Sequence, residues 1–386
     1  MQCSKPTILI TGSDGFVGKN LVIKLEETNN FNLIYFNRND TEEDLINGIG
    51  SSNFIIHLAG ENRPKKEEDF YITNSNLTKS ICETAKTTKR KIPIILFSSS
   101  QFSLDNPYGK SKKQGEKHIE NYYDETGNDV IIYRPPGIFG KWCKPNYNSV
   151  VATFCNNIAN TIPIKIDKKD EEITLVYIDD VIQSVICDLN NLINVSDSAY
   201  KNNGNLIYKK IEPEYKVTLN DLAEMIKSFK KSRNSLIIGK VGLGFERALY
   251  STYLTYLPKD QFSYTVKSHD DERGSFIEML KTYDSGQFSI FTARPGVTRG
   301  GHYHHSKTEK FLIIRGDAKY RFRNLNTNEH FEIVTDGNEN LIVETIPGWS
   351  HDITNIGKEE LIVALWANEI FNPSKPDTYS SEVSNE

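Results

Sequence analysis

Three glycines near the start of the chain constrain its fold more than any other feature. Gly12, Gly15 and Gly18 follow a short apolar run at residues 7–10 and precede a segment with helical periodicity. Because glycine lacks a Cβ, this spacing permits a tight turn, a close approach of the backbone to a ligand and a close contact between helix and strand. The N-terminus of such a helix faces the negative charge of a bound pyrophosphate. The pattern therefore predicts a strand, a turn and a helix that bind a dinucleotide.

Short apolar runs then alternate with longer amphipathic segments as far as about residue 186. The runs are rich in β-branched residues, which is typical of buried parallel strands. They lie at residues 7–10, 33–36, 54–58, 94–97 and 130–133. With helices between them, they predict an α/β fold with a Rossmann-like, doubly wound parallel sheet.

The pattern changes in the second half of the chain. A small helical lobe for substrate is expected up to residue 244, followed by a connector at residues 245–265. Short alternating strands broken by Gly, Asn and Asp follow, and they predict an all-β barrel or sandwich over residues 266–373. The first domain is thus expected to span residues 1–244, and residues 374–386 are expected to form a disordered tail.

Composition excludes several classes of protein. The chain has 46 Lys and Arg against 51 Asp and Glu, with no long basic block, so a nucleic-acid partner is not expected. No segment approaches the roughly 20 apolar residues of a membrane span, and the first apolar run is too short for a signal peptide. Five cysteines without a C-x-x-C spacing indicate reduced, structural thiols. The expected location is the cytoplasm.

A tyrosine and a lysine four residues apart give the strongest catalytic signal. Tyr108 and Lys112 would share one face of a helix, so the ammonium is expected beside the phenol, where it would lower the pKa of the tyrosine. Three serines end the preceding strand. Ser100 is the first choice for a hydrogen bond to a substrate carbonyl, and Ser99 is the alternative.

Arg38 follows the second predicted strand, where an enzyme that prefers NAD usually carries an acidic residue. Its guanidinium suits a 2′-phosphate, which favours NADPH. In the alternative interpretation Arg38 is a solvated loop cation and Asp40 reads the ribose.

These motifs resemble the extended short-chain dehydrogenase/reductase family over roughly residues 5–245, and Ala59-Gly60 and Asn74 add to the likeness. The resemblance implies that Ser100, Tyr108 and Lys112 polarise a carbonyl and exchange its proton while NAD(P)H supplies hydride. Such enzymes usually act on nucleotide sugars. The implied cofactor contacts are Gly12, Asp14, Gly15, Phe16, Val17, Gly18, Arg38, Leu58, Ala59, Gly60, Asn74, Tyr108 and Lys112.

A histidine cluster marks the second half of the chain. His302 and His304 are two residues apart, so on a strand they point to one face, and Glu309 and His351 follow. The four residues are similar to the two ligand motifs of a cupin, a jelly-roll β-barrel. Three imidazoles and a carboxylate suit Zn²⁺, with Fe or Mn as chemically compatible alternatives.

Two other interpretations of this barrel remain open. Residues 271–276 and 299–303 also resemble keto-sugar epimerases of the same barrel, in which His302 would be a base that needs no metal. Alternatively, the barrel only mediates dimerisation and its histidines are idle.

The two halves together closely resemble the bifunctional enzymes of capsule and O-antigen synthesis in the UDP-N-acetyl-L-fucosamine route. The resemblance implies a UDP-sugar substrate, a homodimer and two reactions. The cupin would epimerise a UDP-2-acetamido-2,6-dideoxy-4-hexulose at C3, and the reductase would then produce UDP-2-acetamido-2,6-dideoxy-L-talose. Two hypotheses compete with it: a regulatory NADP-binding protein, and a reductase whose cupin is only a binding or dimerisation module.

Overall fold

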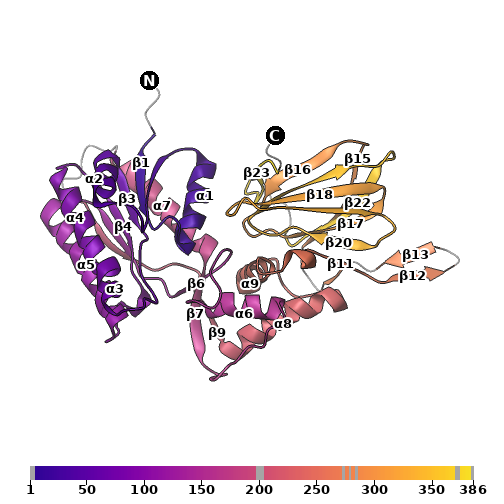
Figure 1. The fold of residues 1–386 in the computed structure, drawn as a ribbon, viewed down its shortest axis with the longest axis horizontal. Coiled ribbons are helices and arrows are strands. Elements are labelled where there is room, and N and C mark those ends of the chain that lie inside the picture. Colours follow the sequence, from indigo (N-terminus) through magenta and orange to yellow (C-terminus); the bar gives the residue numbers. More distant parts are fainter. Residues whose placement is uncertain are drawn as a thin grey trace. The chain divides into compact units, whose positions relative to one another are not determined.

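The computed structural model describes residues 5–196, 204–271, 274–277, 280–282, 286–369 and 374–383. It divides into two compact units (Figure 1). Unit 1 comprises Met1–Ile138 and Thr174–Lys216, and unit 2 comprises Phe139–Ile173 and Val217–Glu386.

Unit 1 is built on a six-stranded parallel sheet in the order β2-β1-β3-β4-β5-β8. Strands β3, β4 and β5 are buried along their whole length, as continuous apolar runs require. The predicted doubly wound sheet is confirmed, with β8 as an additional edge strand. The strands are β1 (Thr7–Thr11), β2 (Asn32–Phe36), β3 (Phe54–His57), β4 (Ile94–Phe97), β5 (Val130–Tyr133) and β8 (Leu206–Lys209).

Helices cover both faces of this sheet (Figure 1). Helices α2, α4 and α5 pack their apolar residues onto one face, and α1 and α7 pack together on the other. A π-helical turn, η1, joins α3 to α4, and a 3₁₀ turn, η2, follows β4. The bounds are α1 (Phe16–Thr28), α2 (Glu42–Ser51), α3 (Glu68–Tyr71), η1 (Ile72–Asn76), α4 (Leu77–Thr87), η2 (Ser100–Ser103), α5 (Pro107–Thr126) and α7 (Ile178–Ser196).

Unit 2 contains two five-stranded antiparallel sheets, which confirms the predicted all-β C-terminal fold. One sheet has the order β11-β20-β17-β22-β15 and the other β19-β18-β21-β16-β23. Their strands are β11 (Ser263–Thr265), β15 (Gln287–Ala293), β16 (Thr298–Tyr303), β17 (Glu309–Arg315), β18 (Asp317–Asn324), β19 (His330–Asp336), β20 (Leu341–Glu344), β21 (Trp349–Asn355), β22 (Leu361–Ala367) and β23 (Tyr379–Ser380).

The remaining elements are short strands and the helices of the lobe. The strands are β6 (Gly137–Phe139), β7 (Glu172–Tyr177), β9 (Tyr215–Thr218), β10 (Ile237–Ile238), β12 (Ser268–Asp271), β13 (Gly274–Ile277) and β14 (Lys281–Thr282). The helices are α6 (Val150–Ala159), α8 (Leu219–Ser235), α9 (Gly244–Leu254) and η3 (Lys259–Gln261).

The helical lobe belongs to unit 2, so the expected domain boundary at residue 244 lies elsewhere in the structure. Arg233 of α8 forms an ion pair with Glu344 of β20, and Glu344 also pairs with Lys310 of β17. All three side chains are largely buried. A buried charge that loses its partner is strongly destabilising, and this network ties the lobe to the barrel. Local sequence patterns carry no signal for it.

The C-terminal segment also differs from expectation. Residues 374–383 were expected to be part of a disordered tail, but Tyr379–Ser380 forms β23 and pairs with β16. Glu272 and Arg273, which belong to the segment at residues 271–276 that resembles keto-sugar epimerases, lie outside the described residues.

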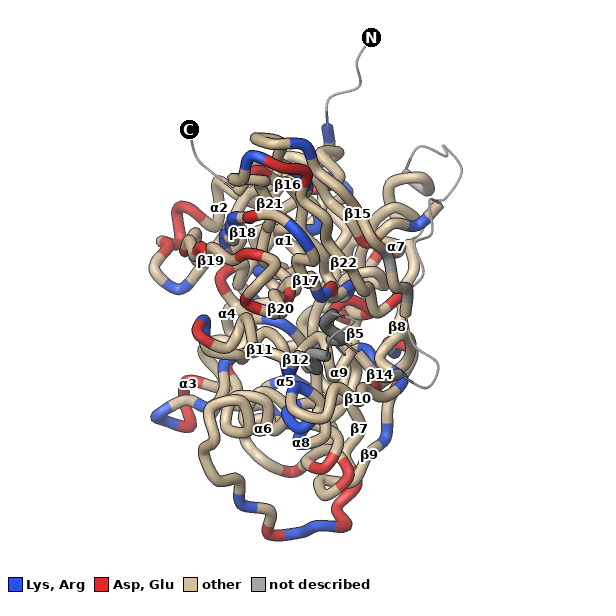
Figure 2. Tube along the Cα trace, turned by 90° about the vertical axis from the view of Figure 1, so that its right-hand side faces the viewer, with Lys and Arg blue, Asp and Glu red and all other residues tan. Residues whose placement is uncertain are grey.

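Acidic and basic residues are interspersed along the described chain (Figure 2). None of its described helices is both long enough and apolar enough to cross a membrane.

Candidate functional sites

The glycine turn has the geometry of a dinucleotide cradle. Gly12 has φ +71°, and a Cβ there would lie 2.8 Å from the backbone of Ala59. A Cβ on Gly18 would lie 2.2 Å from the carbonyl oxygen of Gly12. Helix α1 begins at Phe16, and its N-cap Gly15 supplies no side-chain cap, so the first backbone N–H groups are free of such a competitor for an anion. The residues therefore fit a bound pyrophosphate.

The other expected cofactor residues surround this turn. Phe16 and Val17 lie in the first turn of α1, and Asp14 is exposed in the loop. Leu58, Ala59 and Gly60 directly follow β3, which lies beside β1. Chain connections leave β1 and β3 toward opposite sides of the sheet, and ligands of open α/β sheets bind at such a switch point.

Arg38 lies in the loop after β2, close to the glycine turn. The Gly12 N–H donates to Phe36 O at 2.8 Å, and the Asp14 N–H donates to Asn37 Oδ1 at 3.2 Å. The Arg38 side chain is 82% exposed, and its guanidinium pairs with Glu61 at 2.6 Å. Sequence reasoning missed Glu61. A 2′-phosphate on the cofactor would have to compete with this carboxylate for the Arg38 guanidinium. Asp40 accepts a hydrogen bond from the Asn37 N–H within its own loop.

Tyr108 and Lys112 both lie on α5, as their spacing predicts. Asn106 caps this helix by accepting from the Gly109 N–H at 2.8 Å, and Pro107 occupies its first turn. The phenol of Tyr108 hydrogen-bonds Ser99, which is buried, whereas Ser100 is exposed at the start of η2. The structure therefore favours Ser99 over Ser100 as the hydroxyl beside the tyrosine.

The pKa of Tyr108 does not shift as expected. Burial raises it, and the hydrogen bond to Ser99 only partly opposes this. The ammonium of Lys112 is directed elsewhere, because it donates to Phe97 O at 3.2 Å. Burial lowers the pKa of Lys112 to about 8, with Glu116 acting in the opposite direction. In this structure the expected lowering of the tyrosine pKa by the lysine is therefore wrong.

Asn74 sits in the π-helical turn and holds this region together. Its side chain accepts from the Glu61 N–H at 2.9 Å and donates to Ser111 Oγ at 3.0 Å. A Cβ on Gly60 would lie 2.9 Å from Lys112 Nζ and 3.2 Å from Asn74 Oδ1. Gly60 thus lets the backbone lie directly against the catalytic candidates.

His57, which sequence reasoning did not select, connects the glycine turn to Asn74. Its Nδ1 lies 2.6 Å from Thr11 Oγ1, and its Nε2 lies 2.9 Å from Thr78 Oγ1. Thr78 donates its own proton to Asn74 O, so Thr78 accepts from His57 Nε2–H and the bare Nδ1 accepts from Thr11. Burial, with Lys112 adding to it, lowers the pKa of His57 to about 3, which keeps the imidazole neutral.

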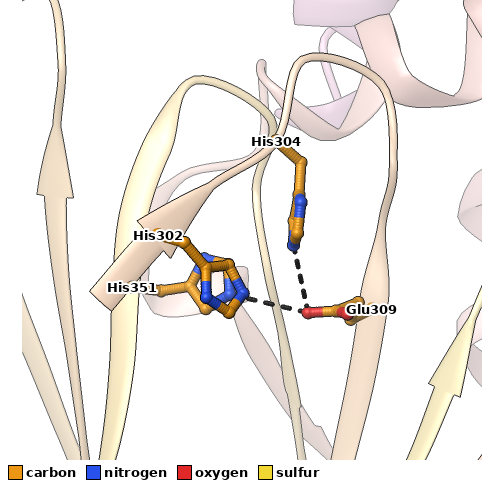
Figure 3. A group of neighbouring side chains, drawn as sticks. All are labelled: His302, His304, Glu309 and His351. Carbon is orange, nitrogen blue, oxygen red and sulfur yellow. Dashed lines mark hydrogen bonds and ion pairs between the residues drawn. The ribbon is translucent and has the colours of Figure 1, made fainter. Parts of the chain in front are cut away.

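In unit 2, His302, His304, Glu309 and His351 converge (Figure 3). One ligand atom from each lies within 4.8 Å of the others. His302 on β16 and His351 on β21 are paired across the sheet, while His304 and Glu309 flank the turn into β17. The four expected ligands are thus brought together by three strands.

The protonation of this cluster suits a cation. Burial and the neighbouring histidines lower the pKa of His302 to about 3, and burial also lowers the pKa of His351. Burial opposes ionisation of Glu309, but the histidines and Lys307 hold its pKa well below the ordinary value. The buried Nε2 of His351 lies 3.5 Å from Glu309 Oε2 and makes no well-formed hydrogen bond in the described part of the chain. The lowered pKa values of His302 and His351, a carboxylate and this orphaned nitrogen fit a divalent metal ion.

Sequence reasoning missed two neighbours of the cluster. Lys307 Nζ lies 3.1 Å from Glu309 Oε1, and Asp377 O lies 2.5 Å from His304 Nδ1. Asp377 is too distant in sequence for any local pattern to reveal it.

Comparison with known proteins identifies both units. Residues 8–200 match the NAD dependent epimerase/dehydratase family, and residues 269–379 match the polysaccharide biosynthesis C-terminal domain. The UDP-2-acetamido-2,6-beta-L-arabino-hexul-4-ose reductase of Pseudomonas aeruginosa is 50% identical over 97% of this chain and 98% of its own.

Solved structures agree. The capsular polysaccharide assembling protein CapF of Staphylococcus aureus is 38% identical, with a TM-score of 0.63 over 98% of this chain and 100% of its own. The UDP-glucuronic acid 4-epimerase of Bacillus cereus, solved with NAD, is 17% identical, with a TM-score of 0.50 over 58% of this chain and 82% of its own, and shares the fold alone. The chain therefore belongs to the NAD dependent epimerase/dehydratase family and is an oxidoreductase that uses a nicotinamide cofactor, fused to a polysaccharide biosynthesis C-terminal domain.

Proposed function

We propose that this chain is a bifunctional nucleotide-sugar enzyme of capsule or O-antigen synthesis. Its barrel epimerises a UDP-2-acetamido-2,6-dideoxy-4-hexulose at C3, and unit 1 then reduces the C4 ketone with NADPH to UDP-2-acetamido-2,6-dideoxy-L-talose. The Pseudomonas relative is named as the reductase of such a 4-keto sugar, and the Staphylococcus relative as a capsule protein. The observation that carries the proposal is the pair of buried Ser99 and half-buried Tyr108, one helical turn before Lys112 on α5, at the edge of the sheet where the cofactor cradle lies.

Reduction requires a hydride for the carbonyl carbon and a proton for its oxygen. A bound reduced nicotinamide supplies the hydride. Tyr108 supplies the proton from its phenol, and its raised pKa keeps that proton in place at neutral pH. Ser99, hydrogen-bonded to the same phenol, orients the oxygen. Lys112, charged below a pH of about 8, donates to Phe97 O in this structure, and we expect its ammonium to turn toward the phenolate that proton donation leaves behind.

Epimerisation requires that a C3 proton be removed and returned on the other face. That proton is acidic only while the adjacent C4 carbonyl can accept the negative charge, so reduction must come second. A Zn²⁺ ion would supply Lewis-acid polarisation of the carbonyl oxygen. His302, His304, Glu309 and His351 would hold it, with Fe or Mn as alternatives. In the metal-free alternative, His302 is the base, and its lowered pKa keeps the imidazole unprotonated at neutral pH, as a base must be before it acts.

An isotope experiment tests both steps. The 4-keto sugar is incubated with the enzyme in deuterated water, with and without NADPH, and products are read by NMR and mass spectrometry. We expect deuterium at C3 without NADPH, and a C4 alcohol carrying that deuterium when NADPH is present. Reduction without exchange at C3 would contradict the epimerase and favour a reductase whose barrel is a binding or dimerisation module.

Prior removal of metal decides between the two epimerase mechanisms. If the cluster works through an ion, dialysis against a chelator abolishes exchange and added Zn²⁺ restores it. Unchanged exchange after complete metal removal would instead support His302 as a metal-free base.

The expected homodimer also remains a proposal. Phe288 and Ile290 on the edge strand β15 are 56% and 65% exposed, and an exposed apolar edge strand favours pairing with another chain. Analytical ultracentrifugation of the wild type and of a Phe288→Lys variant checks this.

A further inference from the structure

We propose that the C-terminal segment Asp377–Ser380 is a clasp that positions the ligands of the barrel's metal centre. The inference rests on the proposed metal site, and it assigns a role to residues that lie outside the ligand set. The segment pairs with the strand that carries His302, and Asp377 contacts the side chain of His304. Thr378 contacts Lys307, which in turn pairs with Glu309.

The backbone of Asp377 fixes the orientation of His304. Its carbonyl oxygen lies 2.5 Å from His304 Nδ1, so the imidazole donates Nδ1–H and presents a bare Nε2 toward Glu309, 3.2 Å away. A metal-bound histidine commonly donates its other ring N–H to a carbonyl or carboxylate, which sets the tautomer and the ring orientation. Asp377 O has this relation to His304.

The side chain of Asp377 organises the turn between His304 and Glu309. Its carboxylate accepts from the N–H groups of His305, Ser306 and Lys307, at 2.9, 2.7 and 2.7 Å. It also accepts from Ser306 Oγ at 3.0 Å. Four donors on one carboxylate fix the backbone of this turn, and with it the separation of the two ligands at its ends.

Thr378 acts on Glu309 through a lysine. Its Oγ1 accepts a hydrogen bond from Lys307 Nζ at 3.3 Å, and the same ammonium lies 3.1 Å from Glu309 Oε1. The other carboxylate oxygen, Oε2, is the one that faces His304 and His351. Lys307 therefore holds one oxygen of Glu309 and leaves the other for an ion.

Strand β23 fastens the clasp to the strand of His302. Ser380 is paired with His302 and Tyr379 with Tyr303, and the two tyrosine rings stack with centroids 5.5 Å apart. Ser350, the neighbour of His351, donates its hydroxyl to Ser381 O. If the segment served only as an edge strand of the sheet, it would need the pairing of β23 with β16 and nothing more. The contacts of Asp377 and Thr378 with the turn between His304 and Glu309 therefore indicate a second role.

The test is metal affinity, measured on the full-length protein by competition with a chromogenic chelator for Zn²⁺. Asp377→Asn keeps the backbone carbonyl and the size of the side chain, but its amide cannot accept all four donors. We expect its zinc affinity to fall by about 10- to 100-fold, which is typical of lost outer-shell partners. Glu382→Gln is the matched control, because it removes an exposed carboxylate just after the clasp and should bind zinc as the wild type does.

A second pair of variants covers the case in which Asp377→Asn fails to fold. Lys307→Gln should also weaken zinc binding, and Lys307→Arg should restore much of it, since an arginine can still hold Glu309. Binding of NADPH, measured by fluorescence, should be unchanged in all variants and reports that unit 1 is intact.

The outcomes separate this inference from the proposed function. Wild-type protein that binds one zinc ion, together with unchanged affinity in Asp377→Asn and Lys307→Gln, would overturn the clasp and leave the metal centre standing. Wild-type protein that binds no divalent ion would overturn the metal centre, and the clasp with it.

Discussion

His57 accepts a hydrogen bond from Thr11, with Nδ1 2.6 Å from Oγ1, at the point where β1 ends and the glycine turn begins. The Ala59 N–H donates to the same threonine oxygen at 3.2 Å. On its other side the imidazole donates to Thr78, which in turn donates to Asn74 O at 3.0 Å. A neutral, buried histidine thus connects the cofactor cradle to the asparagine beside the catalytic candidates.

Two substitutions should separate the two ends of this connection. The amide of His57→Asn can reach the position of Nδ1 and keep the bond to Thr11, whereas that of His57→Gln can reach the position of Nε2 and keep the bond to Thr78. A buried polar group left without its partner costs about 1–3 kcal/mol. We expect His57→Gln mainly to weaken NADPH binding and His57→Asn mainly to lower kcat, each by roughly five- to a hundredfold. Steady-state kinetics and a cofactor titration check this, and equal losses of both quantities in both variants would indicate a purely structural histidine.

The second prediction concerns the serines that end β4. Ser99 hydrogen-bonds Tyr108, whereas Ser100 is exposed, so Ser99→Ala should reduce the rate of NADPH oxidation far more than Ser100→Ala. Tyr108→Phe provides the reference, because loss of a general acid typically costs roughly 10²–10⁴-fold. Stopped-flow measurement of NADPH oxidation compares the three variants. A larger loss in Ser100→Ala would show that the substrate reorganises η2 and brings the exposed serine to the carbonyl.

Neighbouring serines show where sequence reasoning reaches its limit. The strands, the glycine turn and the spacing of Tyr108 and Lys112 follow from local periodicity, and the structure contains them. Which of two adjacent serines faces the phenol depends on the backbone turn after β4, and nothing in the composition of that turn decides it. The direction of the Lys112 side chain likewise depends on the Phe97 carbonyl, which only the fold brings near.

The barrel shows the same division between local and distant signals. Alternation on a strand placed His302 and His304 on one face, because residues two apart share a face, and the likeness to the cupin motifs added Glu309 and His351. The contacts of Asp377 with the ligand turn cross some 70 residues of sequence. A polar C-terminal segment with few apolar residues is typical of disorder, so the sequence predicts a disordered tail. The hydrogen bonds that order this segment come from the turn at residues 305–307, and sequence alone does not show that the fold brings the two together.

The third prediction is a pH dependence set by Lys112. Its pKa is lowered to about 8, so the ammonium is present below that pH and is lost as the pH rises through it. If the ammonium turns from Phe97 O toward the phenolate during reduction, as proposed, kcat/KM for reduction should fall above pH 8. The raised pKa of Tyr108 places ionisation of the phenol above its ordinary value, so the tyrosine cannot produce this limb. In Lys112→Arg, where the cation stays charged, the fall of kcat/KM above pH 8 should disappear from the pH range that can be measured. An unchanged fall in that variant would exclude the lysine as its origin.

The last prediction concerns the choice of cofactor, where Arg38 and Glu61 oppose each other. A charge-assisted hydrogen bond from Arg38 to a 2′-phosphate is worth roughly 1.5–3 kcal/mol, so Arg38→Ala should weaken NADPH by about 10- to 100-fold and NADH much less. In the structure the guanidinium pairs with Glu61 at 2.6 Å, and a 2′-phosphate would have to displace that carboxylate or share the arginine with it.

Glu61→Gln removes the competing charge and should therefore strengthen NADPH binding relative to NADH. Fluorescence titration with both cofactors measures the two ratios. If Arg38→Ala weakens both cofactors equally, the arginine does not read the 2′-phosphate. If Glu61→Gln instead weakens NADH selectively, the carboxylate reads the ribose hydroxyl and the enzyme prefers NAD.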